Sequence, residues 1–155
     1  MSKKVSLDEM MPVIAETLEE NGEVSFISAG TSMLPTIRDR QDTVTLVKPQ
    51  GRLKEGDVPF YRRENGQYIL HRIVYVNGDT YVTRGDNQWE NEYNVAHEQV
   101  IGVLYSIERN GNVYKVTDKS YQRYLKFLPL IRYIRLAYSW LKVRTENFIK
   151  FLKRR

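Results

Sequence analysis

The 155-residue sequence contains no cysteine and only two histidines, His71 and His97. The absence of cysteine excludes disulfide bonds and thiolate metal sites, and it is compatible with a reducing compartment. Two histidines are too few for a convincing histidine-based metal site. We therefore expect no metal and no other cofactor, and the candidates for a catalytic base are few.

Long uninterrupted apolar runs are also missing. No window reaches the roughly 18 apolar residues that indicate a transmembrane helix. The first residues, 1–7, lack the apolar stretch of a secretory signal. The apolar fraction of 41% is nevertheless sufficient for a hydrophobic core. The length predicts one domain with at most an appendage.

Acidic residues are nearly absent from the end of the chain. Residues 119–155 carry 11 Lys and Arg but a single acid, Glu146, whereas residues 1–118 carry 13 Lys and Arg and 18 Asp and Glu. The net charge of +5 therefore divides into an acidic body and a basic tail. A partner that is attracted by positive charge should bind the tail.

Residues 7–20 show the periodicity of a short amphipathic helix. Ser6 and Glu9 form a capping-box pattern at its start, and Gly22 supplies a C-terminal cap. The apolar positions recur at helical spacing: Leu7, Met10, Met11, Ile14 and Leu18. The helix is too short and too charged to span a membrane, and we expect it to pack on the body.

From Glu23 onward the pattern changes to period two and to β-forming residues. Short strands separated by turn signals predict an all-β body. Hairpin turns are expected at residues 77–79 and at Asn110-Gly111. Because proline cannot donate to a ladder, the strand that contains Pro59 is expected at a sheet edge or at a bulge. The expected strands cover residues 24–27, 43–47, 57–62, 67–76, 80–84, 100–108 and 112–116.

After Thr117 a helical pattern returns in a basic segment that is rich in Tyr, Trp and Phe. Pro129 suits the first turn of this helix, or else a kink in a helix that begins near Ser120. The predicted domains are a β domain with its N-terminal helix at residues 1–118 and a basic amphipathic helical tail at residues 119–155. The apolar stripe of the tail is Phe127, Ile131, Ile134, Tyr138 and Leu141.

The segment 30–36, Gly-Thr-Ser-Met-Leu-Pro-Thr, follows a predicted strand and holds Ser32 between a glycine and a proline. Glycine and proline restrict the backbone on either side of one small hydroxyl. Such a segment can present a nucleophile, and it can equally form an ordinary turn. Both interpretations stay open on these residues alone.

A serine hydroxyl is a poor nucleophile until a base removes its proton. His71 is predicted inside a strand, on the face it shares with Ile69 and Ile73, where a histidine is commonly structural. His97 is expected to be solvated in a loop. Asp86 directly follows a strand and can form a turn, or it can orient an imidazole as the aspartate of a catalytic triad does.

Four segments in order resemble the signal peptidase family and its relatives, the serine peptidase superfamily that includes the self-cleaving repressors of the SOS response. Residues 30–36 are similar to the serine motif, small-x-Ser-Met-x-Pro-Thr, and residues 54–60 to the Gly-Asp-Ile/Val-x-x-Phe segment. Residues 71–74, His-Arg-Ile-Val, fall where the family has a Lys or His base before Arg and two β-branched residues. Residues 85–87 match its Gly-Asp-Asn motif, and the resemblance covers residues 24–108.

The resemblance implies a mainly β protein with the coiled antiparallel β body of signal peptidases and SOS repressors. It implies a serine endopeptidase with Ser32 as nucleophile, His71 as base and Asp86 as the support of the base. The histidine occurs in the endoplasmic reticulum and archaeal branch, whose second acid falls here on Glu92, a departure from the pattern. The N-terminal transmembrane anchor of signal peptidases and a helix-turn-helix domain have no counterpart in the sequence.

A second departure concerns the oxyanion. Gly30 stands where the bacterial branch has a serine whose hydroxyl helps to bind the oxyanion. An oxyanion hole must therefore use backbone amides, for which we expect Thr31 and Ser32. An extended peptide would add to a strand edge beside Ser32, in a cleft whose substrate-binding walls include Met33 and Pro59.

The expected partner is thus a peptide or protein substrate. The basic tail is expected to bind an anionic membrane surface, which implies a cytoplasmic protein peripheral at the inner face of the membrane. Packing of the tail on the body or on a second copy is the alternative, and nothing beyond charge suggests nucleic acid. The alternative function is a catalytically inactive peptide-binding or regulatory module, docked to a membrane or a protein by its tail.

Overall fold

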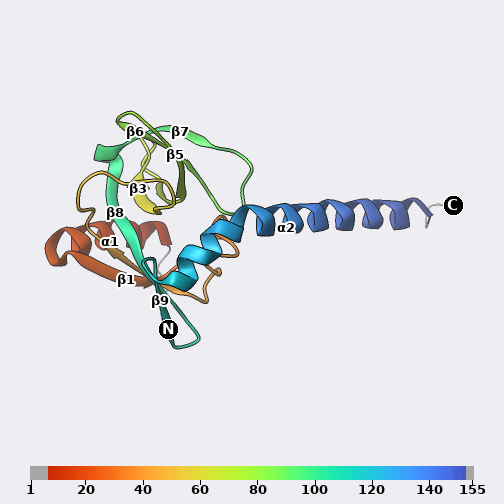
Figure 1. Cartoon of the computed structure of the whole chain (residues 1–155), viewed down its shortest axis with the longest axis horizontal. Helices are drawn as coiled ribbons and strands as arrows, with labels where there is room; N and C mark the ends of the chain where they lie inside the picture. Colours follow the sequence, from red (N-terminus) through yellow and green to blue (C-terminus); the bar gives the residue numbers. More distant parts are fainter. Residues whose placement is uncertain (1–6, 153–155) are drawn as a thin grey trace.

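The computed structural model describes residues 7–152 (Figure 1). Over this range the chain is mainly β, with nine strands in two antiparallel sheets, a short N-terminal helix and a long C-terminal helix. The mainly β class and both terminal helices agree with the expectation from the sequence. The Ser6 position of the expected capping box lies outside the described residues.

Helix α1 (Leu7–Asn21) confirms the predicted N-terminal helix. Its apolar face is buried through Met11, Ile14 and Leu18, and Gly22 ends it at a positive φ of 77° with its amide on the Leu18 carbonyl. The helix packs on the first sheet, where the Cβ of any side chain at position 102 would overlap a Leu18 methyl group. The glycine therefore permits the close approach of α1 to the sheet.

The first sheet has the strand order β1-β2-β8-β3-β4, with β9 paired to β8. Its strands are β1 (Glu23–Ile27), β2 (Thr43–Val47), β3 (Pro59–Arg62), β4 (Tyr68–Leu70), β8 (Val100–Arg109) and β9 (Asn112–Lys115). All neighbours pair antiparallel, and the hairpin at Asn110-Gly111 is confirmed. Since β1 and β4 each have a single neighbour, they are the two free edges of this path.

The second sheet has the order β5-β6-β7, with β5 (Arg72–Asn77), β6 (Thr80–Arg84) and β7 (Glu92–Ala96). The hairpin between β5 and β6 confirms the turn predicted at residues 77–79. Strand β7 has no counterpart in the prediction. Only Val95 is buried in it, and Asn94 within it adopts a positive φ of 61°, so the segment lacks the alternation of apolar residues that indicates a strand. A short 3₁₀ helix (His97–Gln99) joins β7 to β8.

A single strand over residues 67–76 is a wrong prediction, and for the strand that contains Pro59 the sheet edge is wrong, whereas an irregular ladder is found. Strand β3 does not lie at an edge but between β4 and β8, and Pro59 is its first residue, a position that proline tolerates inside a sheet. The ladder between β3 and β8 is irregular one residue later, between Phe60 and Tyr61. The strand predicted at residues 67–76 is divided at His71, since β4 belongs to the first sheet and β5 to the second.

Helix α2 (Lys119–Leu152) continues through Pro129, so this proline lies inside the helix and not in its first turn. The ribbon changes direction near this point, as expected for a proline kink (Figure 1). The first turns pack on the body through Tyr121 and Leu128, both buried. Arg132 and Tyr133 still contact Trp89 of the body, and beyond them the helix extends away from it. No helix within residues 7–152 is long and apolar enough to cross a membrane.

Candidate active site

Ser32 lies in a turn between β1 and β2. Gly30 adopts a positive φ of 114°, which favours glycine, and its amide donates to Asp39 Oδ1 at 2.8 Å. Met33 and Ile37 are buried, and the Ile37 amide donates to the Met33 carbonyl. The turn is thus fixed by apolar side chains below it and by hydrogen bonds within it, with Ser32 only half-buried between them.

The Gly-Asp-Asn segment holds this serine turn directly. The Asn87 amide donates to the Ser32 carbonyl at 2.8 Å, and Asn87 Nδ2 donates to the Thr31 carbonyl at 3.2 Å. A Cβ at Gly85 would lie 2.7 Å from the Ser32 carbonyl oxygen. Two segments that are far apart in the sequence therefore meet at the serine, and the approach needs glycine.

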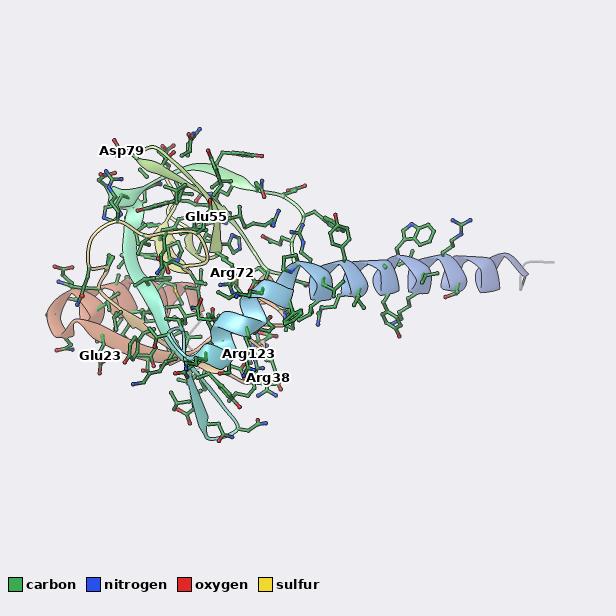
Figure 2. All side chains as sticks on the ribbon, in the orientation of Figure 1. Glu23, Arg38, Glu55, Arg72, Asp79 and Arg123 are labelled. Atoms are coloured by element: carbon green, nitrogen blue, oxygen red, sulfur yellow. The ribbon has the colours of Figure 1, made fainter. Side chains whose placement is uncertain are left out.

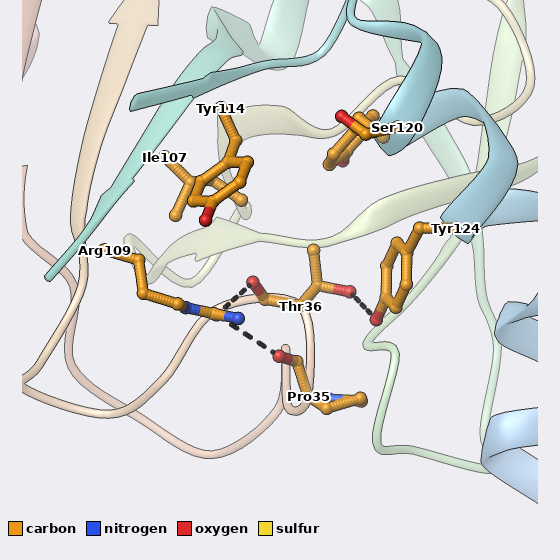
Figure 3. A pocket seen from close by; sticks show the side chains of 8 residues that line it. Pro35, Thr36, Ile107, Arg109, Tyr114, Ser120 and Tyr124 are labelled. Atoms are coloured by element: carbon orange, nitrogen blue, oxygen red, sulfur yellow. Dashed lines mark hydrogen bonds between the residues drawn. The ribbon is translucent and has the colours of Figure 1, made fainter. Parts of the chain in front are cut away.

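The other half of the turn is held from β8 and α2, around a cavity of about 280 Å³. The Arg109 guanidinium donates to the carbonyls of Pro35 and Thr36, and the Thr36 and Tyr124 hydroxyls are 2.8 Å apart (Figure 3). Neither Arg109 nor Tyr124 was singled out from the sequence. Their roles depend on contacts over more than 70 residues, for which no local pattern exists.

Asp86 is buried, but its carboxylate does not contact His71. Arg72 Nε and Nη2 donate to its two oxygens at 2.8 and 2.7 Å, and the Thr36 hydroxyl also donates to it. The same guanidinium donates to the Gly56 carbonyl and to the Tyr121 hydroxyl. Figure 2 shows Arg72 beside the first turns of α2. The expected orientation of the base by Asp86 is therefore corrected: Asp86 forms a buried ion pair beneath the serine turn.

His71 lies where the chain passes from β4 to β5, and its side chain is buried. Its Nδ1 atom is buried without any hydrogen-bond partner in the described part of the chain. A structural histidine in a core normally has its ring nitrogens satisfied. Burial also lowers the pKa of the imidazole below its ordinary value of 6.5, opposed in part by the charge of Glu92. At neutral pH the ring is uncharged and can accept a proton.

Ser32 and His71 line one cavity of about 200 Å³. Its other walls come from α1, from β1, β3 and β4 and from the serine turn: Met11, Phe26, Ser28, Ala29, Gly30, Met33, Phe60, Tyr68, Ile69 and Leu70. Among residues 7–152 no hydrogen bond joins the Ser32 hydroxyl to the imidazole. Such bonds are often long in unliganded sites and shorten when substrate binds.

On its other side His71 borders a second cavity, of about 660 Å³, which Glu92 also lines. Burial raises the pKa of Glu92, but hydrogen bonds from Arg63 and Tyr61 outweigh this, so the net pKa is below its ordinary value. The charge of Glu92 affects the pKa of His71 more than that of Asp86 does. Glu92 is therefore the acid with the larger electrostatic effect on the imidazole, although Arg63 and Tyr61 hold its carboxylate.

The remaining expected site residues are only partly brought together. Met33 lines the cavity with Ser32, whereas Pro59 does not, and Phe60 takes its place because alternation turns the next residue of β3 toward the cavity. The amides of Thr31 and Ser32 have no acceptor within residues 7–152. His97 is not solvated as expected: it is half-buried and its Nδ1 lies 2.8 Å from the Tyr81 hydroxyl.

No group of three His, Asp or Glu side chains in the described part of the chain is arranged to hold a metal ion.

Comparison with protein-family models gives no match, and no curated protein matches the chain either. The site is therefore interpreted from its own geometry. That geometry brings the Ser32 hydroxyl and the uncharged imidazole of His71 to one cavity.

Replacing Gly85 by Ala should displace the serine turn, because the new methyl group overlaps the Ser32 carbonyl oxygen. We expect a loss of about 1–3 kcal/mol in the free energy of unfolding and faster hydrogen exchange at the Asn87 amide, which donates to that carbonyl. Urea unfolding and amide exchange measure both. Gly78→Ala, in an open hairpin turn with nothing near its Cβ, is the control and should leave the Asn87 amide protected. Unchanged exchange in Gly85→Ala would contradict the proposed contact.

Proposed function

We propose that this protein is a serine endopeptidase of the signal-peptidase-like superfamily, in which Ser32 is the nucleophile and His71 the base. The observation that carries the proposal is that the two side chains line the same cavity, between the two free edges of the first sheet. The β body and the order of the four sequence motifs are compatible with that superfamily.

The cavity suits an extended peptide. Strands β1 and β4 each leave one edge without a neighbour in the sheet path, and residues of both line the cavity. A peptide backbone can pair with such an edge while one of its side chains enters the apolar part of the cavity beside Met33 and Phe60. The substrate is therefore a segment that is unfolded or extended at its cleavage point.

The mechanism uses only groups of this chain and water. His71 accepts the proton of Ser32 as the hydroxyl oxygen attacks the scissile carbonyl, and the amides of Thr31 and Ser32 stabilise the oxyanion. His71 then donates the proton to the leaving amine, and the carbonyl re-forms as an ester on Ser32. A water molecule, deprotonated by His71, hydrolyses that ester and regenerates the hydroxyl.

The alternative is a peptide-binding module without catalysis, which the missing hydrogen bond between Ser32 and His71 would favour. Incubation of a peptide library with the wild-type protein and with His71→Ala, followed by mass spectrometry, distinguishes the two functions. Peptidase activity predicts fragments from the wild type alone. Retention of uncleaved peptides by both proteins would support the binding module instead.

Cleavage should depend on pH through His71. The base must be uncharged, so kcat/KM should fall as the pH decreases through the lowered pKa, with the midpoint below 6.5 and a slope of about tenfold per pH unit. Acid also destabilises the fold here, because the unfolded chain binds a proton at His71 at higher pH than the folded chain does. Circular dichroism over the same range is therefore the control. A midpoint above 6.5 would identify a different titrating group.

A further inference from the structure

The part of α2 beyond the body, residues 129–152, is here called the arm. It extends away from both sheets to the C-terminal end of the described chain (Figure 1). Seven large apolar side chains of the arm are each 53–69% exposed: Leu130, Tyr133, Ile134, Tyr138, Trp140, Leu141 and Val143. Such a concentration of exposed apolar surface marks an interaction site.

The apolar stripe predicted from the sequence does not pack on the body. The face of α2 that contacts the body is formed mainly by Tyr121, Tyr124, Leu125 and Leu128. One turn further on, Arg132 and Tyr133 still contact Trp89 of the body. Successive residues rotate by about 100° in an α-helix, so the same face continues along the arm as a mainly polar row. Among the described side chains, that row contains Arg132, Arg135 and Lys142. Tyr133 is the exception, since its ring lies 6.3 Å from that of Trp89 in the body. The other exposed apolar side chains of the arm therefore lie on the sides of the helix away from the body.

The apolar face of the arm is wide. At about 100° per residue, the positions from Val143 through Trp140 and Leu130 to Tyr138 cover roughly 220° of the helix circumference. The seam that one partner helix covers in a coiled coil is much narrower, at positions a and d alone. A second copy of this helix would leave much of the apolar face in water, whereas a lipid interface covers a broad face.

The charges of the arm fit a membrane surface. Arg135 and Lys142 lie at one border of the apolar face, where long side chains can reach the headgroups. At the other border the Arg132 guanidinium lies over the ring of Trp89 in the body, 4.8 Å from its centroid. Arg144, inside the apolar face, lies over the ring of Trp140 at 5.0 Å from its centroid. Trp and Tyr prefer the headgroup level of a bilayer. Residues 119–155 have a net charge of +10, which attracts anionic lipid.

We propose that the arm binds the interface of an anionic membrane. Its apolar face lies at the boundary of headgroups and acyl chains, its basic residues contact lipid phosphates, and the β body remains on the water side of the helix. This placement follows from the opposite directions of the body and the apolar face. It does not depend on peptidase activity, and Ser32→Ala should bind membranes as the wild type does.

The test is co-sedimentation of the full chain with vesicles of phosphatidylcholine alone and with added phosphatidylglycerol. The wild type should bind the anionic vesicles, more weakly at high salt, and should bind neutral vesicles poorly. In Trp89→Phe, Trp140 is the one remaining tryptophan, and its emission should shift to shorter wavelength when anionic vesicles are added. No binding to anionic vesicles, or an unshifted emission, overturns the proposal.

Point variants of the full chain locate the contact. Replacing Tyr138, Trp140 and Leu141 together by Ser should weaken vesicle binding by about 100-fold or more. Replacing Arg135 and Lys142 by Gln should weaken it by about fivefold for each charge. The matched control replaces three similarly exposed apolar residues of the body by Ser, Tyr75, Tyr93 and Val113. The control should bind within about twofold of the wild type.

Two outcomes would assign the arm to another partner. Equal loss in the control and the arm variants would show that binding is not specific to the arm. A lipid-free protein that sediments as a stable dimer, is made monomeric by the arm variant and does not bind vesicles would assign the apolar face to a second copy. Both outcomes contradict the membrane proposal.

Discussion

Ser32→Ala should lower kcat/KM for any cleaved peptide by at least about 10³-fold. The hydroxyl is the only group at the cavity proposed to form the covalent ester, and alanine leaves the backbone amides in place. His71→Ala should have an effect of the same order. Because nucleophile and base act as a unit, the double variant should be hardly slower than either single variant. The measurement is single-turnover cleavage of a peptide selected from the library.

Ser28→Ala is the matched control, since Ser28 lines the same cavity with a hydroxyl that has no role in the mechanism. It should retain activity close to that of the wild type. Ser32→Ala should keep its free energy of unfolding within about 0.5 kcal/mol, because it removes one half-buried hydroxyl. If Ser32→Ala cleaves as fast as Ser28→Ala, Ser32 is not the nucleophile.

Local patterns predicted most of the elements. Helix α1 was predicted from apolar spacing and from Gly22, and the two confirmed hairpins from Asn-Gly turns. These signals depend on residues that are close in sequence, so the chain alone contains them. The mainly β class followed from the same short-range information.

The predictions about strands that were wrong depend on contacts between residues that are far apart in the sequence. Pro59 is tolerated inside the sheet because it begins β3, and no local feature reveals that β8 pairs beside it. The break at His71 arises because the chain leaves one sheet for the other, although the period-two pattern continues through it. Strand β7 was missed because it is largely exposed and carries almost no apolar alternation.

The same limit applies to the candidate site. The motifs located Ser32, His71 and Asp86, but the partner of Asp86 was assigned to the wrong side chain. Arg72 follows His71 directly, so the sequence places both near Asp86 and only the fold decides which one contacts it. The sequence identifies Glu92 as a departure from the family pattern. Only the fold reveals that its charge affects the pKa of His71 more than the charge of Asp86 does.

Asp86→Ala should lower the free energy of unfolding by about 3–5 kcal/mol, because it leaves the buried Arg72 guanidinium without its carboxylate. The side chains of the pair are only 7% and 3% exposed. Asp79→Ala is the matched control: Asp79 pairs with Arg52 at the same 2.7 Å, but its side chain is 90% exposed. We expect the control to lose about 0–1 kcal/mol. Urea unfolding of both variants measures the two free energies of unfolding. Equal losses would contradict the expectation that the buried ion pair matters more than the exposed one.

A second pair of variants separates this structural role from the expected support of the base. Arg72→Met alone should also cost about 3–5 kcal/mol, whereas Arg72→Met with Asp86→Leu should cost less than the two single changes added together, because no buried charge is left unpaired. If Asp86 instead oriented His71, Arg72→Met would spare cleavage and Asp86→Leu would not. The ion pair predicts that both single variants lose cleavage together with stability, since Asp86 also accepts from Thr36 in the serine turn.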